Sequence, residues 1–288
     1  MELVVTVTLF GLVVLGATWL AERIRWSAPL LLMVVGVLGS VIPVVHVPEL
    51  EPEFVLVVLL PPLLYASAVE TSLVDFKRHL ASIGWLSIGL VILTLAAVGL
   101  VVWGVLGVPL AAALALGAVV APPDAVAATA VARRVGLPRR VVTLLEGESL
   151  VNDATALVSL RSALLALSAT LSVASIVGDF AWAVVSAVVI GFVVARLGGL
   201  VFRVTPNSQV TTSLTFLLPF VAYVPTEAVH GSGVLAVVVT GLVLGHRSHV
   251  EQGPEDRVAG RINWRTIQFL LENAVFLLIG LQARSIWA

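Results

Sequence analysis

Long apolar runs recur along the whole chain and are separated by shorter polar stretches. A helix needs roughly 20 apolar residues to cross a bilayer, and these runs lack the alternation that is typical of strands in a membrane barrel. The pattern predicts an all-α polytopic membrane protein in which residues 1–288 form a single transmembrane domain. The longest polar stretch, 246–265, is expected to be only a loop. The spans are expected at about 3–20, 28–45, 54–70, 80–106, 110–132, 141–167, 176–202, 210–229, 231–246 and 265–283.

The basic residues divide the predicted loops into two classes. Every Lys and Arg other than Arg161 and Arg284 lies in alternate loops, and an excess of basic residues marks the cytoplasmic side of a membrane protein. We therefore expect the N-terminus outside, and the C-terminus outside as well after an even number of crossings. No basic leader precedes the first apolar run, which indicates a spanning helix and not a cleaved signal peptide.

Arg161 is the exception that lies inside an apolar run. A charge within a span costs free energy unless it is paired or hydrated. We favour a position near the outer interface, to which this long side chain snorkels.

Composition narrows the classes of function. The chain is 59% hydrophobic and 11% charged, has a net charge of −1 and contains no cysteine. A net charge near zero does not indicate nucleic-acid binding, and the lack of cysteine excludes disulfides and thiolate metal sites. The histidines lie in or near predicted loops without ligand spacing, and the sequence has no GxxxxGK[ST] nucleotide loop. We expect no cofactor, and no metal apart from a monovalent cation.

The sixth run contains the polar cluster EGESLVNDATALV, which begins at Glu146. On a helix, Ser149, Asn152 and Asp153 share one face at positions i, i+3 and i+4. Glu148 lies four residues before Asn152, on the same stripe. A membrane helix with acids, an amide and a hydroxyl along one stripe is expected to line a polar space. A structural hydrogen-bond cluster between helices is the alternative.

The fifth run contains a second unusual sequence, AVVAPPDAVAATA. Pro122 and Pro123 each lack a backbone donor and clash with the preceding turn, so the helix is expected to break there. The freed carbonyls and Asp124 are then expected to face inward, because exposed backbone at membrane depth is tolerated only against protein or a watery cavity. Transporters use such breaks to coordinate ions near the bilayer midplane. A simple proline kink with Asp124 at an interface is the alternative.

Carboxylate, hydroxyl and carbonyl oxygens together suit a hard cation, and a single negative charge among them favours a monovalent ion over calcium. Removal from water favours the protonated form of a carboxyl group. One acid can therefore hold a cation or a proton, but not both at once. Competition at that acid, with access alternating between the two sides of the membrane, is sufficient for antiport.

At these positions the chain resembles the monovalent cation:proton antiporter family, in its sodium/proton exchanger branch. The segment from Pro122 to Val158 is similar to that family's broken helix, basic loop and Asn-Asp helix in succession. Three further segments resemble family signatures: LPPLLYASA at 60–68, EAVHGSGVLAVVVTGLVLG at 227–245 and LLENAVFLLIGL at 270–281. The resemblance therefore covers nearly the whole chain.

The resemblance implies a transporter rather than an enzyme, which exchanges Na⁺ or Li⁺, with K⁺ as a further candidate, for H⁺ without net charge movement. It also implies a homodimer in the lipid of the cell membrane, with ion-binding core helices at about 54–167. Asp153 then binds the ion and the proton, Ser149 and the broken chain at Pro123–Asp124 supply oxygens, and Asn152 holds the site together. Supporting positions are Glu148, Glu146, Glu70, Thr129, Glu227 and Glu272.

Three features depart from the family pattern. Pro123 stands where Thr or a similar residue usually precedes the acid, so that a ligand at this position must be the backbone carbonyl. Ala66 and Ser67 stand where many members carry a carboxylate, so either Glu70 substitutes or the site has one acid fewer. The predicted spans are also fewer than usual, and we expect that the chain is truncated at its C-terminus.

Other classes of function remain open at this point. A passive cation channel could use the same acids, and a truncated antiporter would not transport. An intramembrane hydrolase built on Ser232 is disfavoured, because the GxSxG elbow is incomplete and no base is identifiable by spacing.

Overall fold

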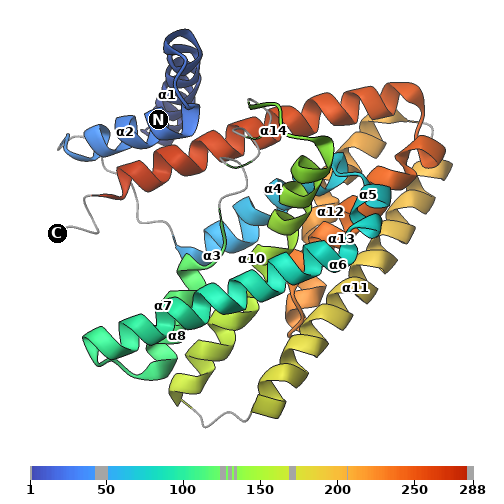
Figure 1. Cartoon of the computed structure of the whole chain (residues 1–288). Helices are drawn as coiled ribbons and strands as arrows, with labels where there is room; N and C mark the ends of the chain where they lie inside the picture. The colour runs from blue at the N-terminus through green and yellow to red at the C-terminus, as the bar shows by residue number, and fades with distance from the viewer. Residues whose placement is uncertain are drawn as a thin grey trace. The chain divides into compact units, whose positions relative to one another are not determined.

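The computed structural model describes residues 2–42, 51–123, 128, 132, 135–168, 173–205 and 207–283. These described residues are almost entirely helical and form no strand (Figure 1). The prediction of an all-α protein is therefore confirmed.

Each predicted span contains one helix or helices that follow one another directly, and the later parts of the predicted spans 28–45 and 110–132 fall partly outside the described residues. The first four spans are α1 (Glu2–Ile24), α2 (Ala28–Ser40), the series α3 (Pro52–Phe54), η1 (Val55–Leu59) and α4 (Leu60–Glu70), and the series α6 (Leu80–Gly84), η2 (Trp85–Leu90) and α7 (Val91–Leu106). The short helix α5 (Leu73–Arg78) lies between the last two series. The later spans are α8 (Leu110–Val120), α10 (Arg139–Ser168), α11 (Val173–Val204), α12 (Ser208–Ala228), α13 (Gly233–Glu251) and α14 (Pro254–Leu281).

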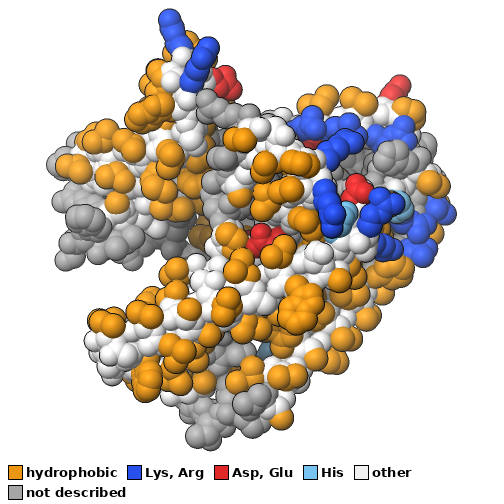
Figure 2. Space-filling model, in the orientation of Figure 1, with side chains coloured by type: hydrophobic (Ala, Val, Ile, Leu, Met, Phe, Trp, Pro, Cys, Tyr) orange, Lys and Arg blue, Asp and Glu red, His pale blue; other side chains and the backbone are white. Residues whose placement is uncertain are grey.

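Many of these helices have the length and surface of membrane spans. Among the described residues, five are long and apolar enough to cross a membrane: Val4–Ile24, Leu80–Leu106, Arg139–Leu167, Ala174–Val204 and Pro254–Leu281. Shorter apolar stretches lie at Ala28–Ser40, Val55–Glu70, Leu110–Val120 and Gly233–Ser248. Large apolar side chains cover much of the visible surface (Figure 2), and Leu93 and Val101, for example, are 66% and 63% exposed. A surface of this kind suits lipid rather than water.

The polar stretch 246–265 differs from its prediction as a loop. The helix α13 continues to Glu251 and α14 begins at Pro254, so only Gln252 and Gly253 separate them. Proline is favoured in the first helical turn, and acids there interact favourably with the helix dipole; Glu255 and Asp256 occupy that turn. Low hydropathy therefore marked the end of the apolar core and not the end of the helix.

The predicted helix break is present. The helix α8 ends at Val120, and Ala121, Pro122 and Pro123 are not helical. Proline has no backbone N–H to donate and its ring clashes with the preceding helical turn, which explains why the helix stops just ahead of the pair. The break leaves the backbone at Pro123 available to side chains of neighbouring helices.

The described chain divides into two compact units. The first consists of 1–63 and 262–288, and the second of 64–261. In the first unit, α2 and α14 approach closely at Gly36 and Gly280, since a Cβ on Gly36 would lie 2.5 Å from the carbonyl oxygen of Leu277. Close approach through small residues is typical of packed membrane helices.

The second unit carries the polar cluster on α10. In this unit α10 packs against α8, η2, α6 and α13, while α11 packs against α12 and α13. The helix α13 also approaches α4, because a Cβ on Gly241 would lie 2.7 Å from the Cβ of Ala68. The α10 helix is thus enclosed on several sides, which buries its polar stripe.

Candidate functional site

A stripe of polar side chains on α10 is buried. Glu148, Asn152 and Thr155 lie on one face at i, i+4 and i+7, and they are 7%, 0% and 2% exposed. Buried polar groups need hydrogen-bond partners. Thr155 and Ser159 donate to carbonyl oxygens one turn earlier, at 3.1 and 2.7 Å. Those hydroxyls are therefore satisfied within the helix, whereas Glu148 and Asn152 require partners beyond it.

Asn152 connects α10 to the helix break. Its Nδ2 group donates to the carbonyl oxygen of Pro123 at 3.5 Å and to Oε1 of Glu148 at 3.2 Å. Its other polar atom, Oδ1, is buried and has no hydrogen-bond donor among the described residues. An unpaired buried acceptor costs free energy and is therefore a candidate ligand atom for a cation.

Glu148 is held from a second direction by a residue that the sequence did not indicate. The hydroxyl of Ser87 donates to the backbone carbonyl of Glu148 at 3.0 Å, and Ser87 is 0% exposed. Ser87 lies in η2, a π-helical turn within the fourth span, and such turns are frequent at functional sites. The sequence signals Ser87 only as a hydroxyl residue within an apolar run, and Ser82 and Thr94 share that feature, so it is not diagnostic.

The remaining predicted ligands are distributed as follows. Asp153, Ser149 and Glu146 are half-buried on α10. Asp124 and Thr129 lie outside the described residues. The structure thus brings together Asn152, Glu148 and the Pro123 carbonyl, with Asp153 adjacent in the chain.

Two of the supporting acids lie on other helices. Glu70 is exposed at the C-terminal end of α4, while Ala66 one turn earlier is completely buried. Glu272 lies on α14, where its Oε1 accepts a hydrogen bond from Nε2 of Gln268 at 2.7 Å.

Arg161 forms an ion pair, in addition to the expected extension of its side chain toward the interface. A guanidinium nitrogen lies 2.6 Å from Oε2 of Glu227, and the two side chains are 49% and 23% exposed. The other oxygen of Glu227 accepts from the backbone N–H of Gly233 at 3.0 Å. The acid on α12 therefore offsets the free-energy cost of the Arg161 charge within a span. The same ion pair joins α10 to the turn between α12 and α13.

Comparison with known proteins identifies the family of this chain. The profile of the sodium/hydrogen exchanger family, transmembrane, matches residues 10–287. The chain belongs to the sodium/hydrogen exchanger family. Membership in this family and the apolar helices together make it a multi-pass membrane protein.

Several exchangers from bacteria are similar in sequence. An uncharacterized Na⁺/H⁺ exchanger of Escherichia coli K12, YjcE, is 33% identical over 301 residues, which cover 99% of this chain and 54% of the relative. A sodium, potassium, lithium and rubidium/H⁺ antiporter of Bacillus subtilis is 32% identical over 268 residues, covering 88% of this chain and 39% of the relative. The chain spans about half the length of the curated exchangers of Escherichia coli and Mycobacterium bovis that it matches.

A solved structure shares the fold. The sodium proton antiporter MjNhaP1 from Methanocaldococcus jannaschii superposes with a TM-score of 0.77 at 23% identity, covering 98% of this chain and 70% of the archaeal chain. The expectation of an antiporter fold is confirmed.

Proposed function

We propose that the protein exchanges a monovalent cation for H⁺ across the membrane. The observation that carries this proposal is the Asn152 side chain, which binds Glu148 and the carbonyl at the Pro-Pro break while its own Oδ1 has no donor in the described part of the chain. Family membership supports the same activity, since the relatives in Bacillus subtilis and Aphanothece halophytica are named as cation/H⁺ antiporters.

In this proposal Asp153 is the group at which a cation and a proton compete. Asn152 fixes the register between α10 and the break, and its Oδ1 joins Ser149 and the Pro123 carbonyl as neutral oxygen ligands. Several neutral oxygens with one carboxylate suit a weakly charged hard cation. Glu148, held through Asn152 and Ser87, keeps the stripe ordered.

The cation is Na⁺ or Li⁺, with K⁺ as a further candidate, and one cation moves for each proton. The Bacillus subtilis relative is named for sodium, potassium, lithium and rubidium, which supports a site of broad monovalent specificity. We further propose that the protein works as a homodimer in the cell membrane, with its N-terminus outside and its basic loops in the cytoplasm.

Exchange is tested with the purified full chain in proteoliposomes that hold an internal acid pH and a pH-sensitive dye. Addition of Na⁺ or Li⁺ is expected to move protons outward, and Asp153→Asn is expected to lower the rate at least tenfold. The matched control is Asp179→Asn, because Asp179 is exposed at the start of α11 and remote from the stripe in sequence.

The outcomes separate the alternatives. Na⁺ flux without proton counterflow would indicate a channel, and an inactive wild-type chain would indicate a non-transporting protein. Full exchange in Asp153→Asn would show that the competing acid lies elsewhere.

A further inference from the structure

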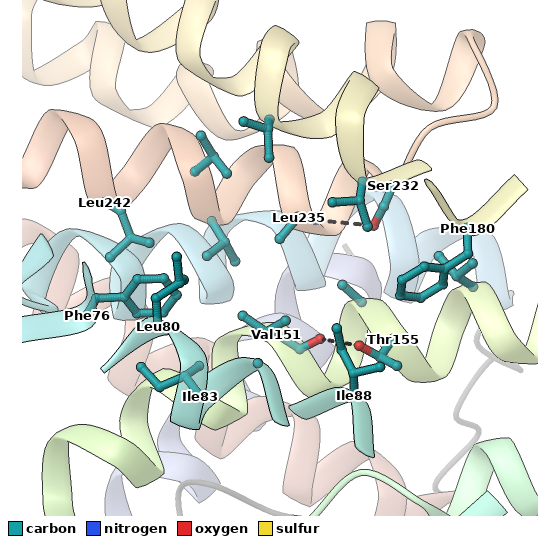
Figure 3. A pocket seen from close by; sticks show the side chains of 17 residues that line it. Phe76, Leu80, Ile83, Ile88, Val151, Thr155, Phe180, Ser232, Leu235 and Leu242 are labelled. Carbon is teal, nitrogen blue, oxygen red and sulfur yellow. Dashed lines mark hydrogen bonds between the residues drawn. The ribbon is translucent and has the colours of Figure 1, made fainter. Parts of the chain in front are cut away.

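An apolar cavity of about 270 Å³ lies within the second unit, between α5, α6, η2, α10, α11 and α13 (Figure 3). Its lining is hydrocarbon except at Thr155 and Ser232. The Thr155 hydroxyl donates to the carbonyl oxygen of Val151 at 3.1 Å, and Oγ of Ser232 accepts from the N–H of Leu235 at 3.3 Å. A cavity with an almost wholly apolar lining stays dry and takes apolar ligands. Water and ions are therefore poor occupants.

The cavity is elongated along the helices. On α13 its lining extends from Ser232 to Leu242, which is about 15 Å at the rise of an α-helix. Phe76, Leu80 and Leu242 lie at one end, and Phe180 and Ser232 at the other (Figure 3). This shape fits a length of hydrocarbon chain better than a compact molecule.

The cavity reaches the outside between α6 and α11. Leu80 and Val188 both line it, yet they are 55% and 45% exposed. The two helices belong to the spans Leu80–Leu106 and Ala174–Val204. An opening between two helices of this length and composition would face the hydrocarbon of a bilayer, which supplies lipid tails.

One end of the cavity lies beside basic residues. Lys77 and Arg78 follow the lining residue Phe76 on α5, and both are exposed. His246 and Arg247 follow Leu242 by one turn on α13, while α5 also carries the half-buried acid Asp75. Figure 2 shows Lys and Arg gathered on the side of the molecule where α5 lies in Figure 1. Basic pockets near membrane helices attract anionic lipid headgroups.

We propose that this cavity binds one acyl chain of an anionic phospholipid, whose headgroup lies at Lys77 and Arg78. The chain enters between α6 and α11 and packs against Val151, Ala154 and Val158 of α10. This lipid site is separate from the cation and proton chemistry of the Asn152 stripe, and its test does not depend on transport.

The site is tested by photo-crosslinking of the full chain in micelles with phosphatidylglycerol that carries a diazirine midway along one tail. Adducts are expected on Val238 and Leu242, which line the cavity and are only 1% and 4% exposed, so that lipid on the outer surface cannot label them. Peptide mass spectrometry locates the adducts.

Two pairs of variants provide controls. Val188→Trp closes the opening and is expected to reduce these adducts at least fivefold, whereas Val189→Trp, on the neighbouring exposed valine outside the lining, retains them. Gly84→Leu fills the cavity from a lining position where a Cβ meets no atom within 4 Å, and Gly104→Leu makes the same change elsewhere on the same span. Adduct yields are compared only among variants whose thermal stability equals that of the wild type.

The headgroup is tested separately. The double variant Lys77→Gln/Arg78→Gln is expected to remove the preference for phosphatidylglycerol over phosphatidylcholine while tail labelling persists. Wild-type labelling confined to exposed residues, or undiminished labelling of Val238 in both Val188→Trp and Gly84→Leu, would overturn the proposal. An unchanged lipid preference in the double variant would overturn the assignment of the headgroup.

Discussion

At the scale of single residues, Asn152 is the most constrained polar group of the stripe. It is 0% exposed and reaches both another turn of its own helix and the carbonyl of a different span. An amide can do this because it carries two donors on one nitrogen, whereas Thr155 and Ser159 each have one proton and use it locally. The residue therefore ties the helix break to α10.

Replacement of Asn152 by leucine, which is similar in size but apolar, is expected to destabilise the protein by about 1–3 kcal/mol, because Glu148 then loses a partner in a buried place. The measurement is thermal unfolding of the purified chain. Ser159→Ala is the control, since the Ser159 hydroxyl donates within α10, to the carbonyl oxygen of Thr155. Equal midpoints for the two variants would contradict the bridging role of Asn152.

At the scale of elements, α10 is joined to the α12–α13 turn by charge and α13 is joined to α4 by close contact. Arg161 and Glu227 form the charged connection. The α13–α4 contact depends on glycine, because a Cβ on Gly245 would collide with the backbone of Val69. One connection is an ion pair and the other is a close contact between backbones, so mutations at the two places should change the free energy of unfolding by different amounts.

The ion pair is half exposed and should be weak. Pairs in such positions contribute about 0.2–1 kcal/mol, so a double-mutant cycle with Arg161→Ala and Glu227→Gln is expected to give a coupling free energy within that range. High salt should reduce it, because screening acts on exposed charges. A coupling free energy above about 3 kcal/mol, as seen on breaking a buried pair, would show that the pair is sealed from solvent.

Replacement of glycine by alanine is expected to have opposite effects on the free energy of unfolding at two positions. Gly178→Ala lies in open space on α11 and is expected to stabilise the helix by up to about 1 kcal/mol. Gly245→Ala is expected to destabilise by about 1–3 kcal/mol, because overpacking forces backbone to move. Unfolding midpoints of the two variants compare these effects, and a stabilised Gly245→Ala would refute close α13–α4 packing.

At the scale of the whole molecule, the alternation of basic loops gives an orientation that can be measured. The chain has no cysteine, so single cysteines report without background. Pro109→Cys, in the turn between α7 and α8, should react with a membrane-impermeant maleimide on intact cells. Gly253→Cys, between α13 and α14, should react only after permeabilisation. The reverse pattern would invert the proposed topology.

The fold was largely predictable because span formation is local. Apolar runs such as 176–202 and 210–229 matched helices within a few residues, since transfer into lipid depends on the composition of each segment. The break at Pro122–Pro123 was predictable for the same reason, as proline acts on its own turn. The prediction of a loop at 246–265 was wrong, because hydropathy reports burial in lipid and not helicity.

The sequence by itself determined the helices, the break and the helix face that carries Ser149, Asn152 and Asp153, because these depend on neighbours within a few residues. Only the tertiary structure decided that Asn152 meets the Pro123 carbonyl, that Ser87 holds Glu148, and that Arg161 finds Glu227. The partners in these contacts are 29, 61 and 66 residues apart in the chain. Periodicity carries no information about which distant face a helix meets, since that is set by the packing of all the helices together.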